Sequence, residues 1–303
     1  MNTANGQAVR VWVNGERVDD APSMSALDHG VTVGDGVFET AKIVDNKIFA
    51  ITRHHDRMDR SLRGLGLQTL DRGRVHEGID AVLADEPIEL GRLRYTVTAG
   101  PGPLGSDRLD GAMTYIVSAG AVPAPPLTTA VAVVPWTRNE RAATVGLKTT
   151  SYAENVVALA AAKGLGGSEA IFANTAGALC EGTGSNIFLV VDGVVLTPSL
   201  ETGPLAGITR ALTIEWLTEA GIQVVEDELP LSLLAEADEA FITSSTRDIQ
   251  PLNAIRVVGS VSTLAGQLAG APVAERTFDD APGRITAQAQ EIFNRMSIER
   301  FDP

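Results

Sequence analysis

Primary amines are scarce in this sequence. Beside twenty arginines, the 303-residue chain contains only four lysines, Lys42, Lys47, Lys148 and Lys163. Chemistry that needs an amine therefore has four candidate residues. Lys148 draws attention because it precedes Ser151, a good helix N-cap, and an alanine-rich run that is typical of a helix. A lysine at a helix start is ordinarily a solvated charge, so other groups must show whether it is a reagent.

Three further segments carry groups that would make such an amine useful. Arg57 lies in RHHDRMDRSL, Glu181 lies in LCEGTGSNIF, and AGITR opens an expected helix over 207–220. Each is unremarkable alone. Together they supply what pyridoxal phosphate needs: a lysine for the Schiff base, a carboxylate that keeps the pyridine nitrogen protonated, and phosphate donors. The N–H groups of Ile208 and Thr209 and the guanidinium of Arg57 would be those donors.

Composition argues against several other functions. The net charge of −14, without any basic run, argues against a nucleic-acid binder. Cys180 is the only cysteine, so the chain can form neither an internal disulfide nor a thiolate metal cluster. His54 and His55 are adjacent on an expected helix and point in different directions, so we expect no metal site. Motifs of nucleotide-binding loops, zinc proteases and serine hydrolases do not occur.

The sequence predicts a cytoplasmic protein without a membrane partner. No apolar run reaches the length of a membrane span, and the first residues lack the basic and apolar regions of a signal peptide. A single cysteine also fits a reducing compartment.

Two domains are expected. Segment 121–127 reads AVPAPPL, and its three prolines favour an extended interdomain linker. Residues 1–120 are expected to form a small α+β domain with helices packed on a largely antiparallel sheet, and residues 128–303 a larger mixed α/β domain.

Local patterns place several elements in the first of these domains. The Asn14-Gly15 and Asp45-Asn46 pairs predict hairpin turns, and apolar spacing predicts a helix over 53–65. GRLRYTVTAG, residues 91–100, is an expected strand. Its alternation puts Arg92, Arg94, Thr96 and Thr98 on one face, and we expect that polar face to meet solvent or substrate.

Six ordered blocks then resemble the class IV aminotransferases, which are the fold type IV pyridoxal-phosphate enzymes. The H-x-x-R-φ-x-x-S pattern of that family matches His54, Arg57, Met58 and Ser61. The blocks, which cover nearly the whole chain, are DHGVTVGDGVFET, HHDRMDRSL, KTTSYAENV, EAIFANTAGALCEGTGSNIFLV, PLAGITR and EAFITSSTRDIQPL.

The resemblance implies a two-domain enzyme with a barrel-like larger domain, pyridoxal 5′-phosphate as cofactor and a homodimeric assembly. It implies that Lys148 forms the Schiff base and transfers the proton, and that Glu181 contacts the pyridine nitrogen. The remaining cofactor-binding residues that it implies are Arg57, Tyr152, Ile208, Thr209 and Ser245. The substrate-contacting residues that it implies are Phe38, Thr40, Arg94 and Ser244.

Substrate anchors distinguish the members of this family. Arg94 stands where branched-chain enzymes carry an arginine and 4-amino-4-deoxychorismate lyases carry a lysine. Ala99 stands where the D-amino-acid enzymes carry an arginine. Val33 and Thr40 stand where branched-chain enzymes commonly have tyrosine and glycine, which weakens that assignment.

We therefore expect a transaminase that moves an amino group between a D-type or broader amino acid, or an amine, and a 2-oxo acid. One alternative is the lyase that releases pyruvate and 4-aminobenzoate. A second alternative, from another class, is a non-catalytic ligand-binding protein in which the lysine is incidental.

Overall fold

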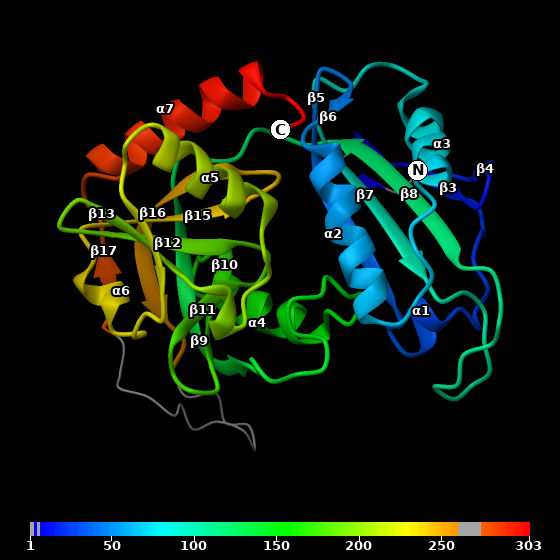
Figure 1. Ribbon diagram of the computed structural model, residues 1–303, viewed down its shortest axis with the longest axis horizontal. Helices are drawn as coiled ribbons and strands as arrows, with labels where there is room; N and C mark the ends of the chain where they lie inside the picture. The colour runs from blue at the N-terminus through cyan, green and yellow to red at the C-terminus, as the bar shows by residue number, and fades with distance from the viewer. Residues whose placement is uncertain (1–2, 5–6, 260–273) are drawn as a thin grey trace. The chain divides into compact units, whose positions relative to one another are not determined.

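The computed structural model describes residues 3–4, 7–259 and 274–303. The chain divides into two compact units, and Figure 1 colours both from blue at the N-terminus to red at the C-terminus. Unit 1 consists of Met1–Pro125, Leu147–Ser151 and Phe301–Pro303, and unit 2 consists of Pro126–Gly146 and Tyr152–Arg300. The short segment that carries Lys148 therefore belongs to unit 1, although unit 2 flanks it in the sequence.

Unit 1 is built on an antiparallel six-stranded sheet in the order β4-β3-β8-β7-β5-β6. Its strands are β3 (Arg10–Val13), β4 (Glu16–Arg17), β5 (Gly36–Val44), β6 (Lys47–Ile48), β7 (Leu90–Thr98) and β8 (Thr114–Ala121). A separate pair is formed by β1 (Thr3–Ala4) and β2 (Gln7–Ala8). Both expected hairpins are confirmed: Asn14-Gly15 joins β3 to β4, and Asp45-Asn46 joins β5 to β6. Positive φ angles at these four residues explain why they occupy the turns.

Helices cover one side of this sheet (Figure 1). They are α2 (Ile51–Gly64) against β5 and α3 (Arg72–Leu83) against β3 and β8, while the short α1 (His29–Thr32) precedes β5. Met58 and Leu62 of α2 are completely buried and join the core of the unit, as their spacing predicts. The helix that was expected over 53–65 is thus confirmed, with a start two residues earlier.

Strand β7 shows the expected alternation, with one exception. Arg92 and Arg94 are exposed, whereas Tyr95 and Val97 lie completely buried in the core. Thr98 was expected on the polar, accessible face, but it is buried, and its hydroxyl accepts a hydrogen bond from the N–H of Gly100. The expectation for Thr98 is therefore wrong, because α1 covers its side chain: a Cβ on Gly30 would lie only 2.3 Å from Thr98 Cγ2.

Unit 2 contains a nine-stranded mixed sheet. Its main path runs β11-β10-β9-β16-β15-β12-β13-β14, with β17 beside β16. The strands are β9 (Thr129–Arg138), β10 (Glu169–Asn174), β11 (Leu179–Gly182), β12 (Asn186–Val191), β13 (Val194–Pro198), β14 (Val224–Asp227), β15 (Glu239–Ser244), β16 (Asp248–Val257) and β17 (Arg276–Thr277). One apolar cluster unites Ile171 of β10, Ile187 of β12 and Ile255 of β16. Strands that are distant in the sheet order thus share one core, as in a sheet that curves onto itself.

The helices of unit 2 are α4 (Ala153–Gly164), α5 (Ile208–Glu219), α6 (Leu233–Glu236) and α7 (Arg284–Glu299), with a 3-10 turn at Leu200–Thr202. Helix α4 packs on β9 and β10 through small residues such as Ala158 and Ala162, and α5 contacts α7 through Trp216 and Phe293. Within the described part of the chain, no helix is long and apolar enough to cross a membrane. The mixture of sheets and helices in the two units confirms the α+β expectation.

Ser151 does not cap the alanine-rich helix. Helix α4 begins at Ala153 with Tyr152 as its N-cap, and no side chain caps it. The hydroxyl of Ser151 instead lies 3.2 Å from the carbonyl oxygen of Gly34, to which it donates. The capping prediction is therefore wrong, because the polar groups of residues 149–151 pair with the chain entering β5 instead.

Candidate active site

Lys148 is held by its backbone between two elements of unit 1. Its carbonyl oxygen accepts a hydrogen bond from the N–H of Phe38 in β5 at 3.0 Å, and its own N–H donates to the hydroxyl of Ser61 in α2 at 3.2 Å. Gly36 permits this close approach, because a Cβ there would lie within 3.2 Å of both Val97 and Thr150. The backbone of Lys148 is thus fixed to a strand and a helix, and the residue as a whole is only half-buried.

The Lys148 amine shares an aromatic neighbour with Arg94. The Lys148 Nζ lies 4.5 Å from the ring centroid of Phe38, and the Arg94 Cζ lies 3.7 Å from the same centroid. Phe38 is almost fully buried, and Thr40 is the cross-strand partner of Arg94 in β7. Because residues two apart in a strand share a face, Phe38, Thr40 and Arg94 lie on one side of the sheet. Unit 1 therefore brings together the Lys148 amine and three of the four expected substrate residues.

Arg57 lies on the other side of β5, in a buried ion pair. Its Nε donates to Glu39 Oε1 at 2.7 Å, and its Nη2 donates to Glu39 Oε2 at 2.6 Å. His54 Nδ1 lies 2.7 Å from the same Oε2 and acts as a donor, since a carboxylate only accepts. All three side chains are buried, and that of Glu39 is fully inaccessible.

Electrostatics define the charges of this triad. Burial by itself would raise the pKa of Glu39, but the adjacent Arg57 guanidinium and the hydrogen bonds from Arg57 and His54 lower that pKa to about 2. Burial also lowers the pKa of His54, in part against the hydrogen bond with Glu39. At neutral pH the triad therefore consists of one anion, one cation and a neutral imidazole.

Glu181 lies at the end of β11 in unit 2 and is partly accessible. Its Oε2 accepts a hydrogen bond from the N–H of Leu205 at 3.0 Å, and its Oε1 lies 3.2 Å from Arg138 Nε in an ion pair. Arg138 also donates to Glu154 at 2.8 Å and stacks over the ring of Phe172. A carboxylate so placed lies next to a cation and retains accessible surface for a further donor.

The start of α5 follows the loop that contacts Glu181. Its N-cap is Gly207, without a capping side chain, and Ile208 and Thr209 in the first turn are buried. A Cβ at Gly207 would lie only 2.0 Å from Asn186 Oδ1, so the approach of these two chains requires glycine. Asn186 in turn donates to the carbonyl oxygen of Leu205 at 2.9 Å, which fixes the loop. First-turn N–H groups of a helix, unless capped, attract anions.

Ser244 and Ser245 lie where β15 ends and the turn to β16 begins. Arg247 in that turn donates to the Ser244 hydroxyl at 3.0 Å and forms a hydrogen-bonded ion pair with the buried carboxylate of Glu169. The same carboxylate accepts hydrogen bonds from Thr183 and, at 2.9 Å, from the N–H of Gly184. Glu169 thus ties the serine turn to the loop that follows Glu181.

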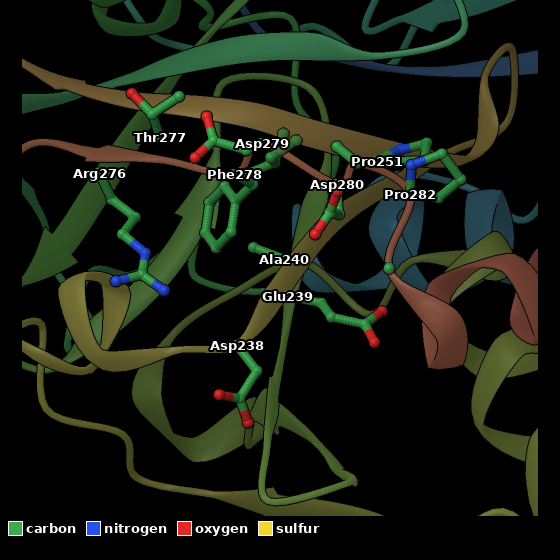
Figure 2. A pocket seen from close by; sticks show the side chains of 13 residues that line it. Asp238, Glu239, Ala240, Pro251, Arg276, Thr277, Phe278, Asp279, Asp280 and Pro282 are labelled. Atoms are coloured by element: carbon green, nitrogen blue, oxygen red, sulfur yellow. The ribbon is translucent and has the colours of Figure 1, made fainter.

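A separate cavity of about 220 Å³ in unit 2 contains none of the expected site residues. Figure 2 shows the carboxylates of Asp238, Glu239 and Asp280 around it. Glu239 accepts hydrogen bonds from the N–H groups of Ile285 and Thr286 at 3.0 and 2.7 Å. This carboxylate therefore caps the start of helix α7, which is a structural role.

The expected site residues fall into two sets, one in each unit. Unit 1 holds Phe38, Thr40, Arg57, Arg94 and Lys148, and unit 2 holds Tyr152, Glu181, Ile208, Thr209, Ser244 and Ser245. Sequence reasoning missed Glu39 and Arg138, and it quoted Ser61 without a role. The available signal for Glu39 was a charged residue in the middle of the otherwise apolar strand GVFETAKIV.

Comparisons with known proteins identify the family. The profile of the family Amino-transferase class IV matches residues 36–255. A putative branched-chain-amino-acid aminotransferase of Methanocaldococcus jannaschii is 34% identical, over 80% of this chain and 87% of that protein. The aminodeoxychorismate lyase of Bacillus subtilis is 31% identical, over 82% of this chain and 87% of its own length.

A solved structure is similar over almost the full length. It is the branched-chain aminotransferase of Thermoproteus uzoniensis with norvaline, which has a TM-score of 0.78, 28% identity and coverage of 97% of this chain and 96% of its own. Pyridoxal 5′-phosphate is the cofactor of this class, and the expectation of that cofactor is confirmed. Since the profile matches well over half of the sequence, the chain belongs to the class IV aminotransferase family.

Proposed function

We propose that the protein is a transaminase of α-amino acids and 2-oxo acids, with Lys148 as its reactive amine and Arg94 as the anchor of the substrate carboxylate. The observation that carries this proposal is that both side chains contact Phe38. The Phe38 ring centroid lies 3.7 Å from Arg94 Cζ and 4.5 Å from Lys148 Nζ. An amino acid presents a nitrogen and a carboxylate on one carbon. Neighbouring amine and guanidinium groups suit such a substrate, because the fork of arginine binds a carboxylate through two hydrogen bonds.

The donor set fits pyridoxal phosphate group by group. Lys148 offers an amine for the aldehyde, Glu181 a partly accessible carboxylate for the pyridine nitrogen, and Tyr152 a hydroxyl for the ring oxygen. The phosphate donors in this proposal are the uncapped N–H groups of Ile208 and Thr209, the hydroxyl of Ser245 and the guanidinium of Arg57. When bound, the cofactor supplies an electron sink for the electron pair released at the substrate Cα.

Residues of this chain perform the proton transfer. Lys148, as a neutral amine, removes the proton from the substrate Cα and holds it at Nζ until it is returned. The backbone hydrogen bonds to Phe38 and Ser61 fix the position from which the amine reaches out. Phe38 and Thr40 line the same face as Arg94 and are proposed to contact the substrate, together with Ser244.

The lyase remains a second candidate because the aminodeoxychorismate lyase of Bacillus subtilis is 31% identical to this chain, against 34% for the aminotransferase of Methanocaldococcus jannaschii. Arg94 favours the transaminase, since it stands where the branched-chain enzymes carry arginine. The D-type or broad specificity remains a prediction from the sequence. A non-catalytic binding protein does not agree with the family to which the chain belongs.

Cofactor trapping tests the role of Lys148. The purified protein is expected to be yellow, and borohydride is expected to bleach it and to fix the cofactor on Lys148, as mapped by mass spectrometry after digestion. Lys148→Ala should abolish turnover and the trapped label. Label that persists on Lys42, Lys47 or Lys163 would show that another amine is the reagent.

Three substrate assays then separate the candidate reactions. Amino-group transfer from D- and L-amino acids to 2-oxo acids, transfer from 1-phenylethylamine, and pyruvate release from aminodeoxychorismate are measured on one preparation. Pyruvate release without amino-group transfer would replace the transaminase proposal by the lyase.

Assembly and location complete the proposal. We propose a homodimer, as in the family that the sequence resembles, and sedimentation that finds a fully active monomer would contradict it. The cytoplasmic location stays a prediction that rests on the single cysteine.

A further inference from the structure

We propose that Glu39 is a positioning residue for Arg57, which holds the guanidinium in the orientation that binds the cofactor phosphate. This inference rests on the proposed contact between Arg57 and that phosphate. Glu39 binds Arg57 side-on, through Nε and Nη2, with hydrogen bonds of 2.7 and 2.6 Å. The Nη1 atom takes no part in that contact, so the guanidinium plane is set while one of its edges points away from Glu39.

The pair is fixed by rigid elements on both sides. Glu39 lies in the middle of β5, and Arg57 lies in the middle of α2, which packs on that strand. His54, one helical turn before Arg57, donates to the same carboxylate at 2.7 Å and restrains it from a third direction. Ser61, one turn after Arg57, accepts the hydrogen bond from the Lys148 N–H. One helix therefore sets both the guanidinium and the backbone of the reactive lysine.

A carboxylate beside a phosphate ligand needs an explanation, because the two anions repel. Glu39 is inaccessible to solvent, and its ionised form is maintained by Arg57 and His54. Without Glu39, Arg57 would be a buried cation that has lost its carboxylate partner. Its long side chain would then be able to adopt several rotamers. Glu39 thus reduces the electrostatic attraction of Arg57 for the phosphate, but it fixes the orientation of the guanidinium. Orientation is the larger benefit where a planar fork must meet phosphate oxygens.

A purely structural ion pair would stabilise unit 1 without affecting phosphate recognition. The two roles differ in a quantity that needs no catalysis, which is the preference of the apoprotein for pyridoxal phosphate over pyridoxal. Pyridoxal keeps the aldehyde and the pyridine ring but lacks the phosphate. The ratio of the two dissociation constants therefore isolates the phosphate contact from the contacts of Lys148 and Glu181.

The experiment titrates cofactor-free protein with each compound and follows binding by fluorescence or absorbance. Arg57→Lys should lower the preference for the phosphorylated compound, since lysine lacks the fork. Glu39→Gln should lower it by about tenfold or more, as expected for a weakened charge-assisted hydrogen bond. The double variant should show little further loss, because Glu39 acts through Arg57. His54→Phe is the matched control: it removes a donor to the same carboxylate, leaves both Arg57 hydrogen bonds, and should change the ratio less than about threefold.

Each alternative result has a defined meaning. An equal loss of affinity for both compounds in Glu39→Gln would overturn the positioning role and leave a structural ion pair. An unchanged ratio in Arg57→Lys would instead contradict the proposed phosphate contact of Arg57. If Glu39→Gln does not fold, Glu39→Asp replaces it, since the shorter carboxylate keeps the charge and withdraws from the guanidinium. An unchanged ratio in folded Glu39→Asp would likewise overturn the proposal.

Discussion

Each of the two units contains a carboxylate–arginine pair next to expected cofactor-binding residues. The two pairs differ in how far their side chains are exposed to solvent. In unit 1, Glu39 and Arg57 form a side-on pair with two short hydrogen bonds, and their side chains are 0% and 5% exposed. In unit 2, Glu181 Oε1 lies 3.2 Å from Arg138 Nε, and the two side chains are 13% and 18% exposed. The same two residue types thus form one sealed pair and one open pair.

This difference separates orientation from ligand binding. The oxygens of Glu39 receive three hydrogen bonds inside the protein, so its carboxylate is committed to its neighbours. Glu181 receives a backbone hydrogen bond from Leu205 and the ion pair with Arg138, and it keeps accessible surface. We expect removal of Glu39 to affect stability and the orientation of Arg57, and removal of Glu181 to affect turnover.

The largest expected effect is on turnover by Glu181→Gln. An amide cannot keep the pyridine nitrogen protonated, so kcat should fall by about a thousandfold or more while the cofactor stays bound. The melting temperature should change little, because the side chain is partly accessible. Glu154→Gln is the matched control, since it removes the other carboxylate partner of Arg138 and should leave kcat nearly unchanged. Near-normal turnover in Glu181→Gln would assign this residue a structural role.

Glu39→Gln should lower the free energy of unfolding, in contrast to Glu181→Gln. Breaking a buried ion pair costs about 3–5 kcal/mol of unfolding free energy. Because the folded pKa of Glu39 is lowered from 4.5 to about 2, its contribution is present above pH 4.5 and is lost as the pH falls towards 2. Urea unfolding at pH 7 should therefore show a large loss for Glu39→Gln and less than about 1 kcal/mol for Glu181→Gln. Equal losses would remove the distinction between the two pairs.

Arg94 adds a third arginine, one that is exposed and stacked on Phe38. Arg94→Ala should raise KM for amino and 2-oxo acids by tens-fold or more, which corresponds to about 2–4 kcal/mol, as for the loss of one partner of a partly desolvated charge pair. It should hardly affect an amine donor without a carboxylate, such as 1-phenylethylamine. Arg92→Ala is the control, because Arg92 lies on the same face of β7 and is also exposed. Similar losses with both kinds of donor would indicate a role in the fold or in cofactor binding.

The smallest expected effect concerns acid stability at His55, the neighbour of His54. Burial, followed by the charge of His76, lowers the pKa of His55 from 6.5 to about 4. Its ring nitrogens contact Tyr95 Oη at 3.1 Å and His76 Nε2 at 3.3 Å, and the other charged groups that act on it are Arg72, His54 and Asp59. Between pH 6.5 and 4 the unfolded chain takes up the proton and the folded chain does not, so stability falls as the pH falls.

This shift corresponds to at most about 3 kcal/mol across that pH range. His55→Gln should therefore flatten the decline in unfolding free energy between pH 6.5 and 4, as measured by urea unfolding at several pH values. A decline as steep as that of the unsubstituted protein would show that other groups cause it.

Local sequence determined the features that depend on few residues. The Asn14-Gly15 and Asp45-Asn46 turns follow from backbone preferences at adjacent positions, and the exposed arginines and buried Tyr95 of β7 follow from strand alternation. The ordered blocks likewise indicated the family, because they name the residue types that its chemistry needs. The roles of Lys148, Glu181 and Arg57 within those blocks remain predictions until they are tested.

Tertiary structure decided which groups meet. Ser151 lost its predicted cap because Gly34, 117 residues away, accepts its hydrogen bond, and the Lys148 N–H finds its acceptor 87 residues away on Ser61. Glu39 has its partners His54 and Arg57 because α2 packs on β5. Local preferences extend over a few residues, whereas burial and hydrogen-bond partners depend on chain segments that only the fold brings together. The sequence therefore determined the chemical groups, and the fold decided that one carboxylate would be sealed and the other left open.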